Sequence, residues 1–193
     1  MCNVLIIVCS YQTMNQLIAF HNKQEEKEAL LKQLQEHYDQ DEVIKGQYWE
    51  DGKGCAVGCT VHSDKHDCYE TQLGIPVWVA RLEDTLFEGM PNEKAKEFPL
   101  KLVKAIPTGF DNWQHIYHQL CIYILEKECK NTDHPLVKQA ICDIITLHRK
   151  ESKEDKEWSA AWSAAGSAAW SAARSAAHYN ISEKLIELLE AEK

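Results

Sequence analysis

Apolar residues recur every three or four positions along most of the chain, which is the spacing of one face of an α-helix. This pattern predicts helices over 22–39, 63–73, 76–88, 92–106, 111–127 and 134–149. Turn residues separate several of these segments: Gly74 is placed to end one helix, and Pro76 is placed to begin the next. The predicted fold class is therefore all-α, a multi-helix globular body.

The segment from Gly52 to His62 departs from the helical pattern. It holds Gly52, Gly54 and Gly58 within seven residues. Glycine disfavours a helix interior and permits sharp turns, so this segment is predicted to be a loop.

A low-complexity repeat follows the predicted body. From Trp158, a tryptophan, glycine or arginine is followed each time by Ser-Ala-Ala. Because alanine is the best helix former, residues 157–190 are predicted to form one long helix packed on the body. An alternative is that residues 158–190 form a homodimer surface. Serine in every repeat and Arg174 argue against membrane insertion.

These patterns divide the chain into three parts. Residues 1–16 form a peripheral segment, residues 17–150 a helical domain with the Gly/Cys loop, and residues 151–193 the long C-terminal helix. An apolar run at Val4–Val8 is too short for the core of a signal peptide. No apolar run reaches the length of a membrane span. The chain is therefore expected to be cytoplasmic.

Composition narrows the classes of partner. The 193 residues carry a formal net charge of −9. An acidic balance argues against nucleic acid, which needs a basic face. The eight cysteines are expected to be reduced, and most of them to be buried small hydrophobic residues.

The segment from Gly52 to Glu70 concentrates the residue types that carry chemistry. A glycine-rich loop before a helix exposes backbone N–H groups that suit an anion. Lys53 and Arg81 supply positive charge, and a protonated histidine can donate to the anion. The hypothesis is a pocket for a small anionic, nucleotide-like ligand. Its proposed residues are Lys53, Gly54, Cys55, Gly58, Cys59, His62, His66, Glu70 and Arg81.

Three alternatives stay open for the same segment. In the first, Cys59 or Cys55 is a nucleophile with His62 or His66 as its base, which predicts a lowered cysteine pKa near a helix N-terminus. In the second, zinc binds among these residues with Cys68 or Glu70; the absence of a paired Cys-x2-Cys motif argues against it, so no metal or cofactor is predicted. In the third, the cysteines are buried and the glycines allow a tight crossing.

The run from Tyr48 to Ser63, with its Gly-Lys-Gly-Cys-Ala-Val-Gly-Cys-Thr core, resembles a family of uncharacterised bacterial and bacteriophage proteins. The resemblance covers about residues 17–193. It continues in Tyr69-Glu70, Leu73-Gly74-Ile75-Pro76, Ala80-Arg81-Leu82-Glu83-Asp84 and Phe87-Glu88-Gly89, and in the Ala/Trp/Ser/Arg-rich stretch before a Leu/Glu-rich tail. It implies a phage or prophage protein in a bacterial host cell and transfers no catalytic role.

The functional expectation is a phage or prophage accessory protein that binds a small anionic ligand at the Gly52–Glu70 segment and thereby counters a host pathway. Two alternatives belong to other classes. One is a Cys/His-dependent hydrolase or transferase acting through Cys59 and His62. The other is a protein–protein inhibitor that uses the Trp/Ala helix.

Overall fold

The computed structural model describes residues 17–131, 135–152, 156–158 and 175–192. The chain is mostly helical and its C-terminal helix packs against the body, which confirms the predicted fold class. The elements are η1 (Ala19–Asn22), α2 (Gln24–Asp39), β1 (Trp49–Glu50), β2 (Lys53–Gly54), α3 (Ala56–Val61), η2 (Tyr69–Leu73), α4 (Val77–Gly89), α5 (Asn92–Ala105), α6 (Trp113–Asn131), α7 (Pro135–Arg149) and α9 (Ser175–Glu190).

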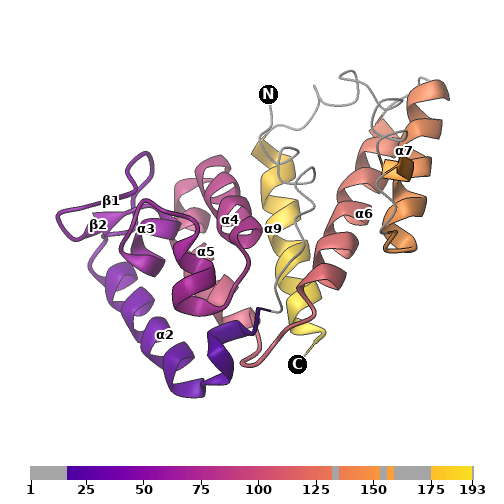
Figure 1. The fold of residues 1–193 in the computed structure, drawn as a ribbon. Helices are drawn as coiled ribbons and strands as arrows, with labels where there is room; N and C mark the ends of the chain where they lie inside the picture. Colours follow the sequence, from indigo (N-terminus) through magenta and orange to yellow (C-terminus); the bar gives the residue numbers. More distant parts are fainter. Residues whose placement is uncertain (1–16, 132–134, 153–155, 159–174, 193) are drawn as a thin grey trace.

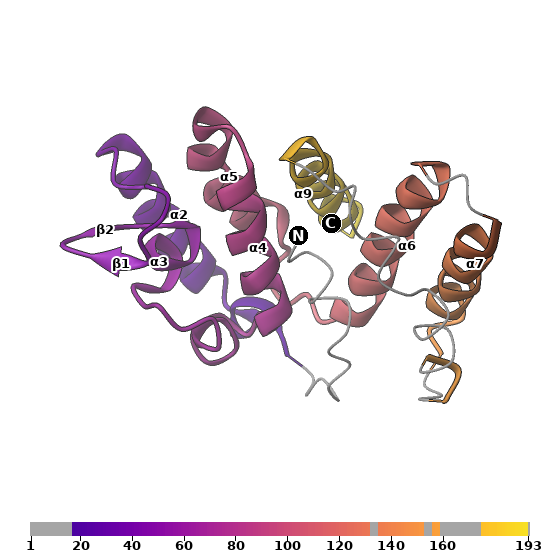
Figure 2. The same ribbon diagram turned by 90° about the horizontal axis from the view of Figure 1, so that it is seen from above.

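The helices form a curved row whose order in space differs from their order in the sequence (Figures 1 and 2). Helices α2 to α5 and the small β1–β2 hairpin lie at one end, and the α6–α7 pair lies at the other. Helix α9 lies between them and contacts α4, α5 and α6. Its residues Ile181, Leu185 and Leu189 join the main hydrophobic core. The C-terminal helix thus connects the two ends of the row.

The long periodic segments fold close to their predicted ranges. Helix α4 has Pro76 as its N-cap residue, and its predicted inward residues Trp78, Leu82 and Leu86 are buried. Helix α5 continues through Pro99, which is itself buried. Helix α2 begins two residues later than predicted, at Gln24: Asn22 has a left-handed φ of 59°, and Lys23 is the N-cap residue.

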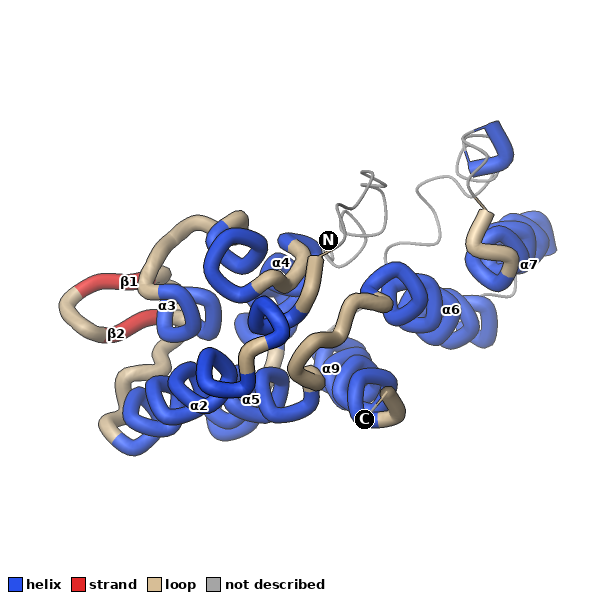
Figure 3. The backbone as a smooth tube through the Cα atoms, turned by 60° about the horizontal axis from the view of Figure 1, so that its bottom comes forward, coloured by secondary structure: helices blue, strands red, loops and turns tan. Residues whose placement is uncertain are grey.

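The predicted loop over Gly52–His62 was wrong. This segment contains strand β2 and the helix α3 (Figure 3). Strand β2 pairs antiparallel with β1, and all six residues of α3 are buried. Two glycines make the packing possible. A Cβ atom on Gly54 would lie 1.9 Å from the Tyr48 carbonyl oxygen, and one on Gly58 would lie 1.5 Å from the same atom. Burial of the whole turn outweighs the poor helix propensity of glycine.

The helix predicted from Ser63 to Leu73 is much shorter. Only Tyr69–Leu73 forms a turn, of the π type, and Gly74 ends it with a φ of 62° as predicted. The Ser63 hydroxyl accepts a hydrogen bond from the Lys65 backbone N–H at 3.1 Å. Such a local side-chain contact competes with helix formation and explains the later start.

A buried pair of histidines joins α6 and α7. The Nδ1 atoms of His118 and His148 are 2.9 Å apart, and the two side chains are 0% and 1% exposed. Among the described residues, neither Nε2 atom has a hydrogen-bond partner. The Trp158 ring packs edge-on against His148, and its indole N–H donates to the Ser152 carbonyl at 2.8 Å. Burial lowers the pKa of His148 to about 3, and the neighbouring His118 adds to this shift.

Several predictions concern residues beyond the described ranges. The described ranges do not include the predicted peripheral segment 1–16 or the repeat at 159–174. The continuity of the predicted helix over 157–190 therefore also lies outside the described residues. Trp158 is partly buried against the second hydrophobic cluster, which is built from α6 and α7. Within the described ranges, no helix has both the length and the apolar character needed to cross a bilayer.

Candidate functional site

Four side chains beside the β hairpin form a connected group, here called the His37–His62 cluster: His37, Glu42, Trp49 and His62. The Nδ1 atom of His37 lies 2.7 Å from Oε2 of Glu42. Its Nε2 atom lies 2.9 Å from Nε2 of His62. The His62 ring stacks on the Trp49 indole with centroids 4.2 Å apart. A carboxylate, two imidazoles and an indole are therefore in continuous contact.

Each member of the cluster is held by a different local structure. His37 occupies the last turn of α2. The Glu42 N–H returns to the His37 carbonyl at 3.0 Å, so the turn after α2 brings the carboxylate back to the ring. His62 caps the C-terminus of α3 in the left-handed conformation, with φ 49° and ψ 43°. Trp49 lies in β1, on the hairpin that packs against α3.

Gln33 fixes the position of α3 relative to α2. Its side-chain amide donates to the carbonyls of Cys59 at 2.7 Å and Thr60 at 3.1 Å. These carbonyls belong to the end of a helix and lack partners within it. The contact therefore supports the turn that carries His62.

Solvent exposure differs among the members of the His37–His62 cluster. The His37 side chain is 12% exposed and that of Glu42 is 20% exposed, whereas His62 is exposed. Burial, followed by the proximity of His37, lowers the pKa of His62. His62 is therefore mostly neutral near pH 7. If Glu42 accepts the His37 Nδ1 proton, His37 presents a lone pair at Nε2, and His62 donates to it.

The predicted nucleophiles lie behind this surface. Cys55 is 2% exposed and Cys59 is 0% exposed. Burial raises the pKa of each thiol to about 12. The Cys59 Sγ atom lies 3.3 Å from the Gly54 carbonyl oxygen. The expectation of a lowered cysteine pKa was wrong, because the six-residue helix α3 is inside the core rather than at an open edge.

The backbone N–H groups expected to hold an anion already have partners. The Gly54 N–H donates to the Glu42 carbonyl at 3.0 Å, and that of Cys55 donates to the Gln47 carbonyl at 2.6 Å. Gly54 and Gly58 are buried against the Tyr48 carbonyl. The hairpin and α3 thus use these groups for their own packing, as the tight-crossing alternative describes.

The other predicted site residues each lie in a different local setting. Lys53 is exposed in β2, opposite Glu50. The Nε2 atom of His66 lies 3.4 Å from the Asp84 carboxylate. Glu70 accepts a hydrogen bond from the Val77 N–H at 3.0 Å and so caps α4. Arg81 is exposed on α4.

A second polar group is buried beneath the predicted site. The hydroxyl of Tyr69 hydrogen-bonds the carboxyl group of Glu83, and both residues are almost fully buried. Burial raises the pKa of Glu83 to about 8. Glu83 is therefore mostly a neutral carboxylic acid near pH 7, and it stabilises the packing of η2 on α4.

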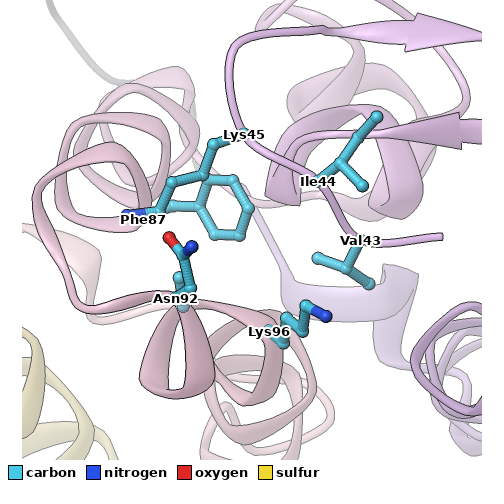
Figure 4. A pocket seen from close by; sticks show the side chains of 7 residues that line it. Val43, Ile44, Lys45, Phe87, Asn92 and Lys96 are labelled. Carbon is cyan, nitrogen blue, oxygen red and sulfur yellow. The ribbon is translucent and has the colours of Figure 1, made fainter. Parts of the chain in front are cut away.

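A pocket of about 360 Å³ lies between the segment after α2 and helices α4 and α5 (Figure 4). Its two lysines have partners: Lys45 donates to the carbonyls of Glu88 and Met90 at the end of α4, and Lys96 pairs with Asp41. None of the predicted site residues lines it. Its lining residues are Val43, Ile44, Lys45, Phe87, Asn92, Ala95 and Lys96.

Sequence reasoning included His62 and missed the other three members of the cluster. His37 fits the apolar face of its helix, and Glu42 follows in a polar segment, so neither is conspicuous in the chain. The His37–His62 contact spans 25 residues, and no local spacing encodes it. Within the described ranges, no group of three or more His, Cys, Asp or Glu residues is placed to hold a metal ion.

Comparisons with known proteins give no match to a family model, to a curated protein or to a solved structure. The resemblance to bacterial and bacteriophage proteins therefore stays a prediction.

Proposed function

We propose that this protein binds a small ligand at the exposed edge of the His37–His62 cluster. The proposal rests on one observation: the exposed imidazole of His62 is held in place by three separate contacts. His62 is held by its position as the cap of α3, by the hydrogen bond to His37 and by stacking on Trp49. A side chain that is already ordered loses little conformational entropy when a ligand binds.

The electrostatics restrict the chemistry of the ligand. Because the pKa of His62 is lowered, its neutral form prevails near pH 7. With its Nε2–H donated to His37, the ring offers a ligand one lone pair, at Nδ1, rather than positive charge. Glu42 adds a carboxylate to the same cluster. A ligand that offers a proton or a Lewis acid suits this surface at neutral pH. A free anion, which the sequence favoured, would bind through protonated His62 and more tightly in mild acid.

A second candidate function is acid–base catalysis. The order carboxylate, imidazole, imidazole in Glu42, His37 and His62 favours it, because the carboxylate orients the first ring and the first ring polarises the second. In this enzyme His62 would be the general base. A thiolate at Cys59 has no part in it, since its thiol pKa is raised to about 12.

A ligand screen by NMR tests the proposal. Nucleotides and cyclic dinucleotides, whose bases and sugars carry N–H and O–H donors, are added to metal-free protein at pH 7.5, and inorganic phosphate is added at pH 7.5 and at pH 5.5. The Trp49 indole and His62 imidazole signals are followed. A ligand at 100 times its Kd should also stabilise the fold by about 2.7 kcal/mol. We expect the His62→Gln variant to lose the response. His21→Gln is the matched control, because His21 also pairs with a carboxylate, Glu26, at 2.8 Å.

The two candidate functions give different outcomes in the same experiment. Mass analysis of the recovered ligand should show an unchanged compound if the protein only binds it. A chemically altered compound would indicate the enzyme. If no compound shifts the Trp49 or His62 signals, or if His62→Gln responds like the wild type, the proposal is refuted.

A further inference from the structure

The His37–His62 contact brings two ring nitrogens, one from each histidine, toward one point. The two Nε2 atoms are 2.9 Å apart, and the ring planes are inclined by 82°. The rings come from different elements, α2 and the end of α3. Only one proton fits between the two atoms, so the pair is either a single N–H···N hydrogen bond or a pair of ligands to a cation placed beside both.

The Glu42 carboxylate leaves Nε2 of His37 with a lone pair that a cation can bind. The carboxylate lies 2.7 Å from Nδ1 of His37, on the opposite side of the ring from Nε2. This contact places the His37 proton on Nδ1 and leaves a lone pair on Nε2. Histidines that bind metals in proteins commonly donate their other N–H to a carboxylate in this way.

We propose that Nε2 of His37 and Nε2 of His62 together bind a divalent first-row transition-metal ion. This inference rests on the proposed function, because it names the ligand class of the same site. With metal–nitrogen bonds of about 2.0–2.1 Å, the observed spacing gives an angle of about 90° at the metal. That angle suits adjacent positions in the square or octahedral geometry of Cu²⁺ or Ni²⁺.

Zn²⁺ requires a small adjustment. Tetrahedral coordination would need the two nitrogens about 3.3 Å apart. His62 is exposed and lies at the end of a short helix, so its ring has room to move outward. When the metal binds, the proton between the rings transfers to Nδ1 of His62 by exchange with water. Two neutral imidazoles therefore become two ligands without net proton release.

The remaining coordination positions face solvent or a bound ligand. No third His, Cys, Asp or Glu joins the pair to make a larger metal-binding group in the described part of the chain. Water or an anionic ligand would complete the coordination. The metal would then supply the positive charge that neutral His62 and the Glu42 carboxylate lack. Imidazole ligands favour Ni²⁺, Cu²⁺ and Zn²⁺ over Mg²⁺, which prefers oxygen.

Isothermal titration of the untagged full chain with NiCl2, CuCl2 and ZnCl2 tests this site, with MgCl2 as the negative control. We expect His37→Gln and His62→Gln to abolish one binding event that the wild type shows. Glu42→Gln should weaken that event about 10–100-fold, as removal of an outer carboxylate typically does. His21→Gln keeps the cluster intact and should bind like the wild type.

A second readout locates the metal. The Trp49 ring centroid lies 4.2 Å from that of His62 and 5.4 Å from that of His37. Paramagnetic Cu²⁺ at the proposed position should therefore broaden the Trp49 indole signal before the other tryptophan signals. His62→Gln is the decisive variant, because its exposed side chain can be replaced without opening the core.

Each outcome decides the question. Loss of the binding event and of the Trp49 broadening in His62→Gln supports the site. Identical titrations of wild type and His62→Gln would overturn it, and so would an imidazole ¹⁵N spectrum that keeps its Nε2–H signal in excess metal. If organic ligands shift the cluster in metal-free protein while no metal binds there, this inference fails and the proposed function stands.

Discussion

The buried imidazole pair between α6 and α7 makes a quantitative prediction about acid stability. The pKa of His148 is lowered to about 3 in the folded protein, from an ordinary value of 6.5. Between these two pH values, His148 is protonated in the unfolded chain and neutral in the folded chain. This contribution to stability is fully present above pH 6.5 and is lost as the pH falls toward 3. The total loss is about 5 kcal/mol, of which about 2 kcal/mol is already lost at pH 5.

The variant His148→Asn isolates this effect. Asparagine does not titrate, and its amide can still hydrogen-bond Nδ1 of His118. The cavity left by the smaller side chain lowers the free energy of unfolding at every pH. The difference in slope between the two proteins is therefore the informative quantity. Glu83 has the opposite pH dependence, because its folded pKa is raised to about 8, but it is present in both proteins and cancels.

Urea unfolding followed by circular dichroism at pH 7.5, 6.5, 5.5 and 5.0 measures the slopes. We expect the wild type to lose about 2 kcal/mol more than His148→Asn between pH 7.5 and 5. Thr146→Ala is the control, because it replaces an exposed residue without a titratable group on the same helix. Parallel curves for wild type and His148→Asn would refute the reasoning. If the variant does not fold, an imidazole NMR titration that places the pKa of His148 near 6.5 would refute it equally.

Three further predictions test the predicted loop and its surroundings. Gly58→Ala should cost more than about 4 kcal/mol in urea unfolding, because its Cβ would lie 1.5 Å from the Tyr48 carbonyl oxygen; a loss under about 1 kcal/mol would contradict the close crossing. Because the pKa of Glu83 is about 8 in the folded protein and 4.5 is its ordinary value, the wild type should lose about 5 kcal/mol of stability from this group as the pH rises from 4.5 to 8. Glu83→Gln should not show this loss, and equal losses of the two proteins over that range would exclude a neutral Glu83. In native protein treated with iodoacetamide, peptide mass spectrometry should find exposed Cys142 labelled well before buried Cys55, and rapid labelling of Cys55 would restore the nucleophile hypothesis.

The sequence alone determined the helices whose signals are local. Pro76 begins α4 and Gly74 ends the turn before it, because each fixes the backbone at its own position. The spacing of Trp78, Leu82 and Leu86 identified the buried face of α4 in the same way. A repeat of 3.6 residues is a property of neighbouring positions, so a helix can be predicted from it without knowing how the rest of the chain folds.

Tertiary structure decided the conformation and chemistry of the Gly/Cys segment. Gly58 has a poor helix propensity, yet it lies in α3 because only a residue without a side chain fits against the Tyr48 carbonyl. The same burial turned Cys59 from a predicted nucleophile into a packed thiol with a pKa of about 12. Propensity and motif describe a residue in isolation, whereas burial depends on which distant backbone covers it.

The candidate site also depended on contacts between distant segments. The sequence identified His62, but its partner His37 lies 25 residues earlier on a helix face that reads as apolar. The two rings meet where α3 packs on α2, a contact that includes the hydrogen bond from Gln33 to the end of α3, and the turn after α2 returns Glu42 to the His37 ring. Local spacing places a side chain on a helix face, and the packing of one element on another decides which side chains touch.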